Sequence, residues 1–307
     1  MSAGWVAAQV RSRSLAGHCL GPAGAREVAG AGSLDGALAF LATSSYGPRL
    51  HSGLDLATSE HEVFASVLWN LRVLAGWSPA MGASRLHVLA GVFELANLRG
   101  YLARIEGYRA PASFDLGSLA AVPGRETPAT INELRDVLRR SSWGDPGAVD
   151  ASGVYVALQF ALARRIVDDV TEAVAWAQTY AALVLARLVV EGCAPERDSN
   201  AAANARIVLG SRAAAARTLD ELRRALGRGV APVLEGVQGA GDLWLAEFRW
   251  WTHLWDDAQG RLRHSAAGPE VVVAAVAVLA ADAWRVQMAL EIAARAGRGI
   301  EVLDAVA

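Results

Sequence analysis

Lysine is missing from this sequence of 307 residues, so all 29 of its basic residues are arginines. We read this as a bias of overall composition and draw no function from it. Positive charge is not in surplus either, because the formal net charge at pH 7 is −2. A general nucleic-acid-binding protein needs surplus positive charge to neutralise phosphates. The composition therefore argues against nucleic acid as a partner.

Cysteine is also scarce, with Cys19 and Cys193 as the two cysteines of the chain. They have neither the spacing of a metal site nor the number that a disulfide framework needs. The most apolar run, residues 271–281, stops at Asp282, well short of the roughly 20 residues of a membrane-spanning helix. Residues 1–14 carry two arginines and lack the apolar core of a signal peptide. We therefore expect a cytoplasmic protein without a membrane span.

Strand signals are nearly absent, because alternating β-branched runs joined by Asn-Gly or Asp-Gly turns do not occur. Apolar residues recur instead with the period of a helix. Glycine follows the last apolar turn of three expected helices, at Gly107, Gly192 and Gly297, where a left-handed C-cap residue belongs. The sequence therefore predicts an all-α fold, with long helices over residues 59–76, 84–106, 154–166, 172–191, 246–262 and 269–296.

A short pattern occurs three times along the chain. It reads Ser or Thr, then Leu or Ile, then Asp or Asn, any residue, Ala or Leu, and Leu four residues later. These are the features of a helix start, in which a hydroxyl group caps the first turn and an apolar stripe follows. The copies begin at Ser33, Thr130 and Thr218, and Glu133 and Glu221 complete capping boxes in the second and third.

The segments before and after the copies of this pattern also resemble one another. A Leu-Gly-small triplet precedes each copy, and an aromatic residue ahead of a turn follows the first two. The spacing of roughly 90 residues is longer than that of ordinary solenoid repeats. We therefore predict three related helical modules about a pseudo-threefold axis, in residues 1–112, 113–200 and 201–307. The triplets are Leu20-Gly21-Pro22, Leu116-Gly117-Ser118 and Leu209-Gly210-Ser211, and the aromatic turns are Tyr46-Gly47-Pro48 and Trp143-Gly144-Asp145-Pro146.

One stretch suggests catalysis, the acidic sequence Asp168-Asp169-Val170-Thr171-Glu172. Clustered carboxylates hold Mg²⁺, so one alternative function is a helical, Mg²⁺-dependent enzyme that handles diphosphates, like an isoprenoid synthase. Such an enzyme needs a second, facing cluster, and the pair Asp256-Asp257 lacks a third acid. A second stretch, His61-Glu62-Val63-Phe64-Ala65, begins like a zinc motif but has alanine at the second ligand position. We therefore predict no catalytic residue, metal or cofactor, and expect a solvated acidic stretch at a helix junction.

Two groups of residues are candidates for binding a partner. Trp244, Phe248, Trp251 and Trp255 share one helical face, which we expect to be buried in the core. Trp250 falls off this face and is predicted to be an exposed aromatic anchor. The second group consists of arginines on the repeated short helices, whose apolar faces should point to the core and leave the charges to a partner. These arginines are Arg135, Arg139, Arg223 and Arg224.

Four segments of the chain resemble the central-stalk subunit of V/A-type rotary ATPases, called C in archaeal and bacterial complexes and d in eukaryotes. The likeness covers nearly the whole chain through short, spread-out motifs. Near the closing motif, Gln287 and Met288 stand where the family often has a charge and an asparagine. The matching segments are Trp5 to Arg13, Ser33-Leu34 with Thr43-Ser44-Ser45-Tyr46-Gly47, Glu94-Leu95-Ala96-Asn97-Leu98-Arg99 with Arg104, and Trp284 to Gly297 with Ile300-Glu301.

The resemblance implies an all-α funnel of three modules that performs no chemistry. Such a subunit lies on the cytoplasmic face of the membrane, where it caps the proteolipid ring and receives the tip of the central shaft. The expected partners are therefore the proteolipid ring and the shaft subunits of a proton- or sodium-translocating ATPase. Together with the repeat, the resemblance predicts that the four arginines line a central concavity and contact the shaft.

Overall fold

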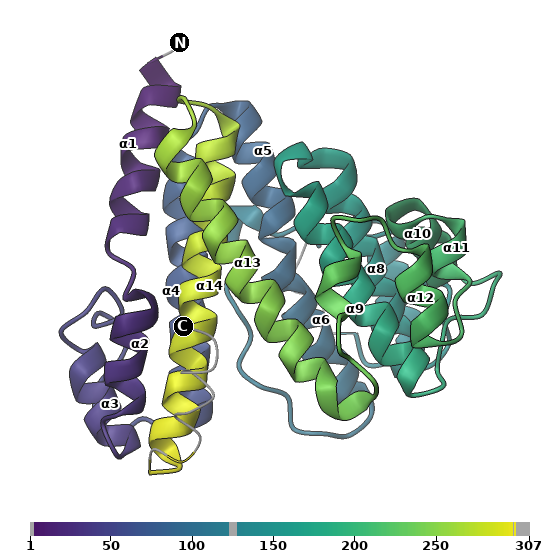
Figure 1. Ribbon diagram of the computed structural model, residues 1–307, viewed down its shortest axis with the longest axis horizontal. Coiled ribbons are helices and arrows are strands. Elements are labelled where there is room, and N and C mark those ends of the chain that lie inside the picture. The colour runs from purple at the N-terminus through teal and green to yellow at the C-terminus, as the bar shows by residue number, and fades with distance from the viewer. Residues whose placement is uncertain (1–2, 123–127, 297, 299–307) are drawn as a thin grey trace. The chain divides into compact units, whose positions relative to one another are not determined.

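The computed structural model describes residues 3–122, 128–296 and 298, and every regular element within them is a helix (Figure 1). The prediction of an all-α fold is confirmed for this part of the chain. The arrangement of three modules as a funnel stays a prediction.

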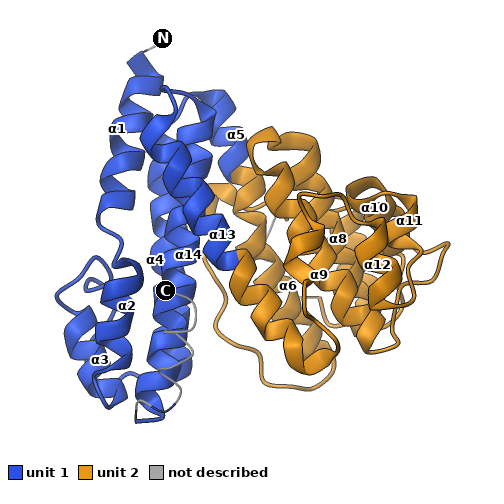
Figure 2. Cartoon of the chain, viewed as in Figure 1, with its two compact units in different colours: residues 1–86, 251–307 blue, residues 87–250 orange. Residues whose placement is uncertain are grey.

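The chain folds into two compact units (Figure 2). Unit 1 combines residues 1–86 with residues 251–307, and unit 2 consists of residues 87–250. The boundaries between the units fall within helices α5 (Ala80–Leu89) and α13 (Leu243–His264). They do not coincide with the predicted module limits near residues 112 and 200, and the division into three modules stays a prediction.

Helix α14 (Pro269–Ala294) forms the core of unit 1. It is apolar on nearly all sides, and 18 of its 26 residues are buried. A helix of this kind must be surrounded by other helices, and α14 packs against α1, α2, α3 and α4, which lie beside it in Figure 1. These helices are α1 (Ala3–Gly17), α2 (Gly21–Ala29), α3 (Leu34–Leu41) and α4 (Leu56–Trp77).

Unit 2 is built around α8 (Ala151–Asp169), which packs against α6, α9 and α10. Small residues such as Ala181, Ala182 and Ala186 are fully buried in its core, where they let neighbouring helices approach closely. The helices of this unit are α6 (Gly91–Ile105), α7 (Ile131–Arg139), α9 (Val174–Val190), α10 (Asn200–Leu209), α11 (Ser211–Ala214) and α12 (Leu219–Ala225), with 3₁₀ turns at Gly117–Leu119, Thr171–Ala173, Ala231–Leu234 and Ala240–Asp242.

The largest departure from the predicted helices is at residues 84–106, where the structure has two helices, α5 and α6, in place of one. Helix α6 begins at Gly91, where an added Cβ atom would lie 2.8 Å from Leu162 Cδ1 of α8. Glycine permits this close approach and is also a poor helix former. Gly107 and Gly192 have the predicted left-handed conformation, with φ of +84° and +71°. The predicted cap Gly297 lies outside the described residues.

Two helical segments are long and apolar enough to cross a membrane, Thr171–Val190 and Pro269–Ala294. The expected helix over residues 269–296 therefore meets this criterion although its apolar run 271–281 is short, and the absence of a membrane span stays a prediction. Most of the apolar stretch of each segment is buried inside the protein, 61% in the first and 78% in the second. This finding is weak evidence for a membrane span, because a buried core helix meets the same criterion.

Candidate functional site

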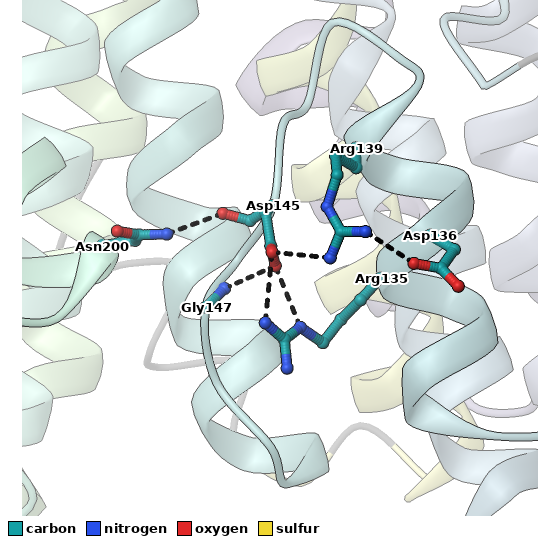
Figure 3. Close-up of polar contacts among 6 residues, drawn as sticks. All are labelled: Arg135, Asp136, Arg139, Asp145, Gly147 and Asn200. Atoms are coloured by element: carbon teal, nitrogen blue, oxygen red, sulfur yellow. Dashed lines mark hydrogen bonds and ion pairs between the residues drawn. The ribbon is translucent and has the colours of Figure 1, made fainter.

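The two predicted arginines of α7 bind a carboxylate of their own chain (Figure 3). Arg135 donates two hydrogen bonds to Asp145, from Nε to Oδ1 at 2.9 Å and from Nη2 to Oδ2 at 3.1 Å. Arg139 donates to Oδ2 of the same carboxylate at 3.0 Å and to Asp136 at 2.7 Å. The bonds from Arg135 are the main reason why the pKa of Asp145 lies well below its ordinary value.

Asp145 in turn holds the loop that follows α7. Its carboxylate accepts the backbone N–H of Gly147 at 2.9 Å, and its carbonyl oxygen accepts a bond from Asn200 at 2.8 Å (Figure 3). Gly147 has φ of +76°, a conformation that favours glycine. Arg135 and Arg139 therefore organise the loop. The side chain of Arg139 is 55% exposed and that of Arg135 is 20% exposed, so Arg139 is the more accessible to a partner.

The predicted arginines of α12 are likewise engaged near their own helix. Arg223 donates to the carbonyl oxygen of Leu234 at 3.1 Å and to the Asp220 carboxylate at 2.6 Å. Arg224 is exposed and donates to the backbone carbonyl of Asp220 at 3.1 Å. Each arginine pair thus contacts its own helix or the segment that follows it. Arg224 is the more exposed of the two arginines of α12.

The prediction that Trp250 is an exposed anchor was wrong. Trp250 is half-buried and packs against the core of unit 2, where its ring centroid lies 6.1 Å from that of Tyr180. The predicted stripe is buried only in part, because its first member, Trp244, is 51% exposed and Trp251 and Trp255 are half-buried. The most buried line of α13 instead passes through Ala246, Leu254 and later residues spaced by four, and Trp250 falls on that line. Phe248 is buried as predicted.

The three repeated segments have the same local structure. In each, the N-cap hydroxyl accepts a hydrogen bond from the backbone N–H three residues later, at 3.1 Å for Ser33 and 3.2 Å for Thr130 and Thr218. Glu133 and Glu221 fold back and accept the backbone N–H of the residue before the cap, at 2.9 and 2.8 Å. The predicted helix starts are therefore confirmed at all three positions.

Asp282 of α14 forms a buried carboxylate site in unit 1. The residue is 1% exposed. Its carboxylate accepts the successive backbone N–H groups of Leu20 at 3.1 Å and Gly21 at 2.7 Å, and the hydroxyl of Tyr46 at 2.9 Å. Burial raises its pKa, although these bonds and the charge of Arg285 oppose the rise. A charged group is stable at this depth because it is fully engaged by donors.

Glu94 of α6 forms a matching site in unit 2. It is 4% exposed. Its carboxylate accepts the successive backbone N–H groups of Ala121 at 2.9 Å and Val122 at 2.6 Å, and the indole N–H of Trp143 at 2.6 Å. The guanidinium of Arg165 lies 4.7 Å from the centroid of the Trp143 ring. Both sites therefore use an acid on a core helix, two adjacent amides, an aromatic donor and a nearby arginine.

The aromatic donors are positioned by identical turns. Ser44 donates to the carbonyl three residues earlier at 2.7 Å and accepts the backbone N–H of Tyr46 at 3.2 Å. Ser141 makes the same two bonds, at 2.8 Å to the earlier carbonyl and at 3.1 Å from Trp143. Each turn directly follows its repeated helix, α3 or α7. The predicted aromatic turns thus belong to the buried carboxylate sites, a role that the sequence analysis did not identify.

The predicted upstream triplets are equivalent in part. Leu20-Gly21 supplies the two amides of the unit 1 site. In unit 2 these amides come from Ala121 and Val122, whereas the Gly-Ser of the predicted triplet lies in the 3₁₀ turn Gly117–Leu119. In the third copy, Gly210 joins α10 to α11 with φ of +87°, and the neutral side chain of Gln178 donates to the nearby Val208 carbonyl at 3.2 Å.

The acidic stretch at the end of α8 is a helix junction. The side chain of Asp168 is 49% exposed and pairs with Arg164 at 3.3 Å, and Glu172 lies in the following 3₁₀ turn. Asp257 pairs with Arg261 at 2.8 Å. In the part of the chain that the structure describes, no group of three His, Cys, Asp or Glu residues is placed to hold a metal ion. The geometry therefore offers no support for the Mg²⁺-dependent alternative.

Comparison with protein-family models and with curated proteins gave no match.

Proposed function

We propose that this chain is a non-catalytic coupling subunit of a V/A-type rotary ATPase, which links the proteolipid ring of the membrane sector to the central rotor shaft. The observation that carries the proposal is repeated construction. One capped helix start occurs three times, and one buried carboxylate site occurs in each of the two units. Repeated helical modules are what the resemblance of the sequence to this family implies.

The buried carboxylate sites suit a part that transmits torque. Each site ties a core helix to a crossing chain segment and to an aromatic turn through three hydrogen bonds to one carboxylate. Such buried, fully paired networks hold elements in one arrangement, because each broken bond leaves a buried group unsatisfied. In this proposal the protein is attached to the cytoplasmic face of the membrane through the ring.

The partner surface that we propose is centred on the exposed arginines of the repeated helices, Arg139 and Arg224. Arg135 and Arg223 support this surface through their bonds to Asp145 and Leu234. An exposed charge at a partner contact acts mainly on recognition and on the association rate, and its effect weakens as salt screens it.

The coupling function is tested in membranes that contain the ATPase but lack this chain. They should hydrolyse ATP without translocating ions, and addition of the purified chain should restore ion uptake, measured with a proton- or sodium-sensitive dye. Ion translocation that is equally strong with and without the chain would contradict the proposal. Parallel sedimentation of the chain with ring-containing membranes separates a binding defect from a coupling defect.

The partner surface is tested by charge reversal at Arg224, which leaves the ion pairs of Arg135, Arg139 and Arg223 intact. Arg224→Glu should weaken capture of the shaft subunits at low salt, while its melting temperature stays near that of the wild type. Arg212→Glu is the matched control, because Arg212 is an exposed arginine of α11 outside the repeated helices. If Arg224→Glu and Arg212→Glu capture the shaft subunits equally well, the shaft contact lies on a different face of the protein.

A further inference from the structure

Unit 1 contains a cavity of about 240 Å³ between α1, α4, the turn at residues 45–46 and α14. One water occupies about 30 Å³ of liquid volume, so the cavity has room for a small polar group together with water. Arg11 lines it from α1, Asn70 from α4 and Ser45 from the turn, while Asp282 and Tyr46 form part of its inner wall.

The acid in the inner wall is already satisfied. The Asp282 carboxylate accepts bonds from Leu20, Gly21 and Tyr46, and the residue is 1% exposed. An entering molecule therefore meets mainly the other polar groups of the lining.

These other groups are hydrogen-bond donors. The side chains of Arg11, Ser45 and Asn70 have no hydrogen bond or ion pair with any residue that the structure describes. Their guanidinium, hydroxyl and amide groups provide donors to a ligand, and the guanidinium is always charged.

The surrounding sequence adds no competing acid. Helix α1 carries Arg11 and Arg13 and no carboxylate, and α4 has no carboxylate from residue 63 to its end. The nearest acid toward the start of α4, Glu62, pairs with Arg49 at 2.9 Å. Among the described residues that line the cavity, Arg11 is therefore the one arginine and Asp282 the one carboxylate.

We infer that this cavity binds a small oxyanion of the phosphate class through Arg11, Asn70 and Ser45. Arginine matches the geometry of phosphate oxygens, and hydroxyl and amide donors complete their coordination. The phosphate can belong to a soluble monoester or to a lipid headgroup, because Val10 and Trp69 beside these residues are 64% and 53% exposed. The site is independent of the coupling function proposed above.

The first experiment titrates the full chain with inorganic phosphate at constant ionic strength, with chloride as reference, by calorimetry. Loss of a charge-assisted bond weakens binding by about tenfold or more, so Arg11→Gln should raise the Kd by at least that factor and Asn70→Ala by less. Arg295→Gln has the same change of charge on an exposed arginine of unit 1 outside the cavity, and it should bind like the wild type. Melting curves of each variant establish that it is folded.

The second experiment measures co-sedimentation with phosphatidylcholine vesicles that do or do not contain phosphatidic acid. If the chain binds vesicles only when they contain phosphatidic acid, and this binding needs Arg11, the site belongs to a lipid phosphate. If the chain binds inorganic phosphate through Arg11 but does not bind these vesicles, the site belongs to a soluble ligand. The inference is overturned if neither phosphate source binds, or if Arg11→Gln and Arg295→Gln bind equally.

Discussion

The two buried carboxylate sites differ mainly in how far along the chain their parts lie. In unit 2, Glu94 binds amides 27 and 28 residues away and an indole 49 residues away. In unit 1, Asp282 binds amides 262 and 261 residues away and a phenol 236 residues away. The same set of donors is therefore assembled once from neighbouring segments and once from the two ends of the chain. Forming the site depends on the final packing and not on sequence proximity.

The two sites also differ in their third donor and in their arginine. Trp143 both donates to Glu94 and stacks with Arg165, so that one ring serves both charges. In unit 1 the tasks are divided, because Tyr46 donates to Asp282 while Arg285 lies over Trp255 at 4.4 Å. In unit 1 the hydrogen bond to the acid and the contact with the arginine therefore involve different aromatic rings. A substitution of one ring there changes one of these interactions at a time.

The largest effect should follow removal of either acid. Asp282→Ala and Glu94→Ala each leave three donors and a nearby arginine without their carboxylate, and should lower the free energy of unfolding by about 3–5 kcal/mol. Urea denaturation measures both, and the double variant should show roughly the sum, because the sites share no residue. Glu291→Ala, which breaks a surface pair with Arg295, is the control and should cost at most about 0.5 kcal/mol. If Asp282→Ala or Glu94→Ala is as stable as Glu291→Ala, the two buried carboxylate sites are not equivalent in their contribution to stability.

Removing the aromatic donors should have the next largest effect. Tyr46→Phe deletes one hydrogen bond to Asp282 with little change of shape and should cost about 1–3 kcal/mol. Trp143→Phe should cost more, because it also leaves a cavity and removes the ring that faces Arg165. Thermal and urea unfolding of both variants measure the difference. Equal losses would show that the indole of Trp143 contributes only its hydrogen bond.

The free energy of unfolding should depend on pH through the titration of Asp282. Burial raises the pKa of Asp282 in the folded state above the ordinary value of 3.8. Protonation of Asp282 therefore favours the folded state, and its contribution to the free energy of unfolding is fully present below pH 3.8. It is lost as the pH rises through the raised pKa. The free energy of unfolding of the wild type, minus that of Asp282→Asn, should therefore fall over this range, by about 1.4 kcal/mol for each pH unit of the shift. A difference that is constant or rises with pH would show that burial does not govern this carboxylate.

The smallest effects should come from the helix caps. Ser33→Ala, Thr130→Ala and Thr218→Ala should each cost about 1 kcal/mol, because each deletes one cap bond. The value at Thr218 is informative, since this cap belongs to the copy that lacks the aromatic turn of the first two. Similar losses at all three positions, measured by urea unfolding, would show that the cap acts locally. A much larger loss at Ser33 and Thr130 would show that it acts through the carboxylate sites.

Features that involve residues close together in the sequence could be predicted from it. Few contacts between residues far apart in the sequence could be. The helix starts at Ser33, Thr130 and Thr218 were predictable, because a cap bond joins residues three positions apart. Both acids carried a signal of burial in the sequence. Asp282 interrupts an otherwise apolar helix, and Glu94 stands between Phe93 and Leu95. A lone acid in such surroundings is buried only when it is paired.

By itself the sequence determined the all-α class, the repeated capped starts and the left-handed glycines at 107 and 192, since each depends on the period of apolar residues or on the conformation of one residue. The tertiary structure alone decided that Arg135 and Arg139 bind Asp145, that Trp250 packs inward, and that residues near both chain ends meet at Asp282. The physical reason is that burial depends on which faces of different helices meet. A helix of many apolar residues, such as α14, is compatible with several such pairings until the whole core is packed.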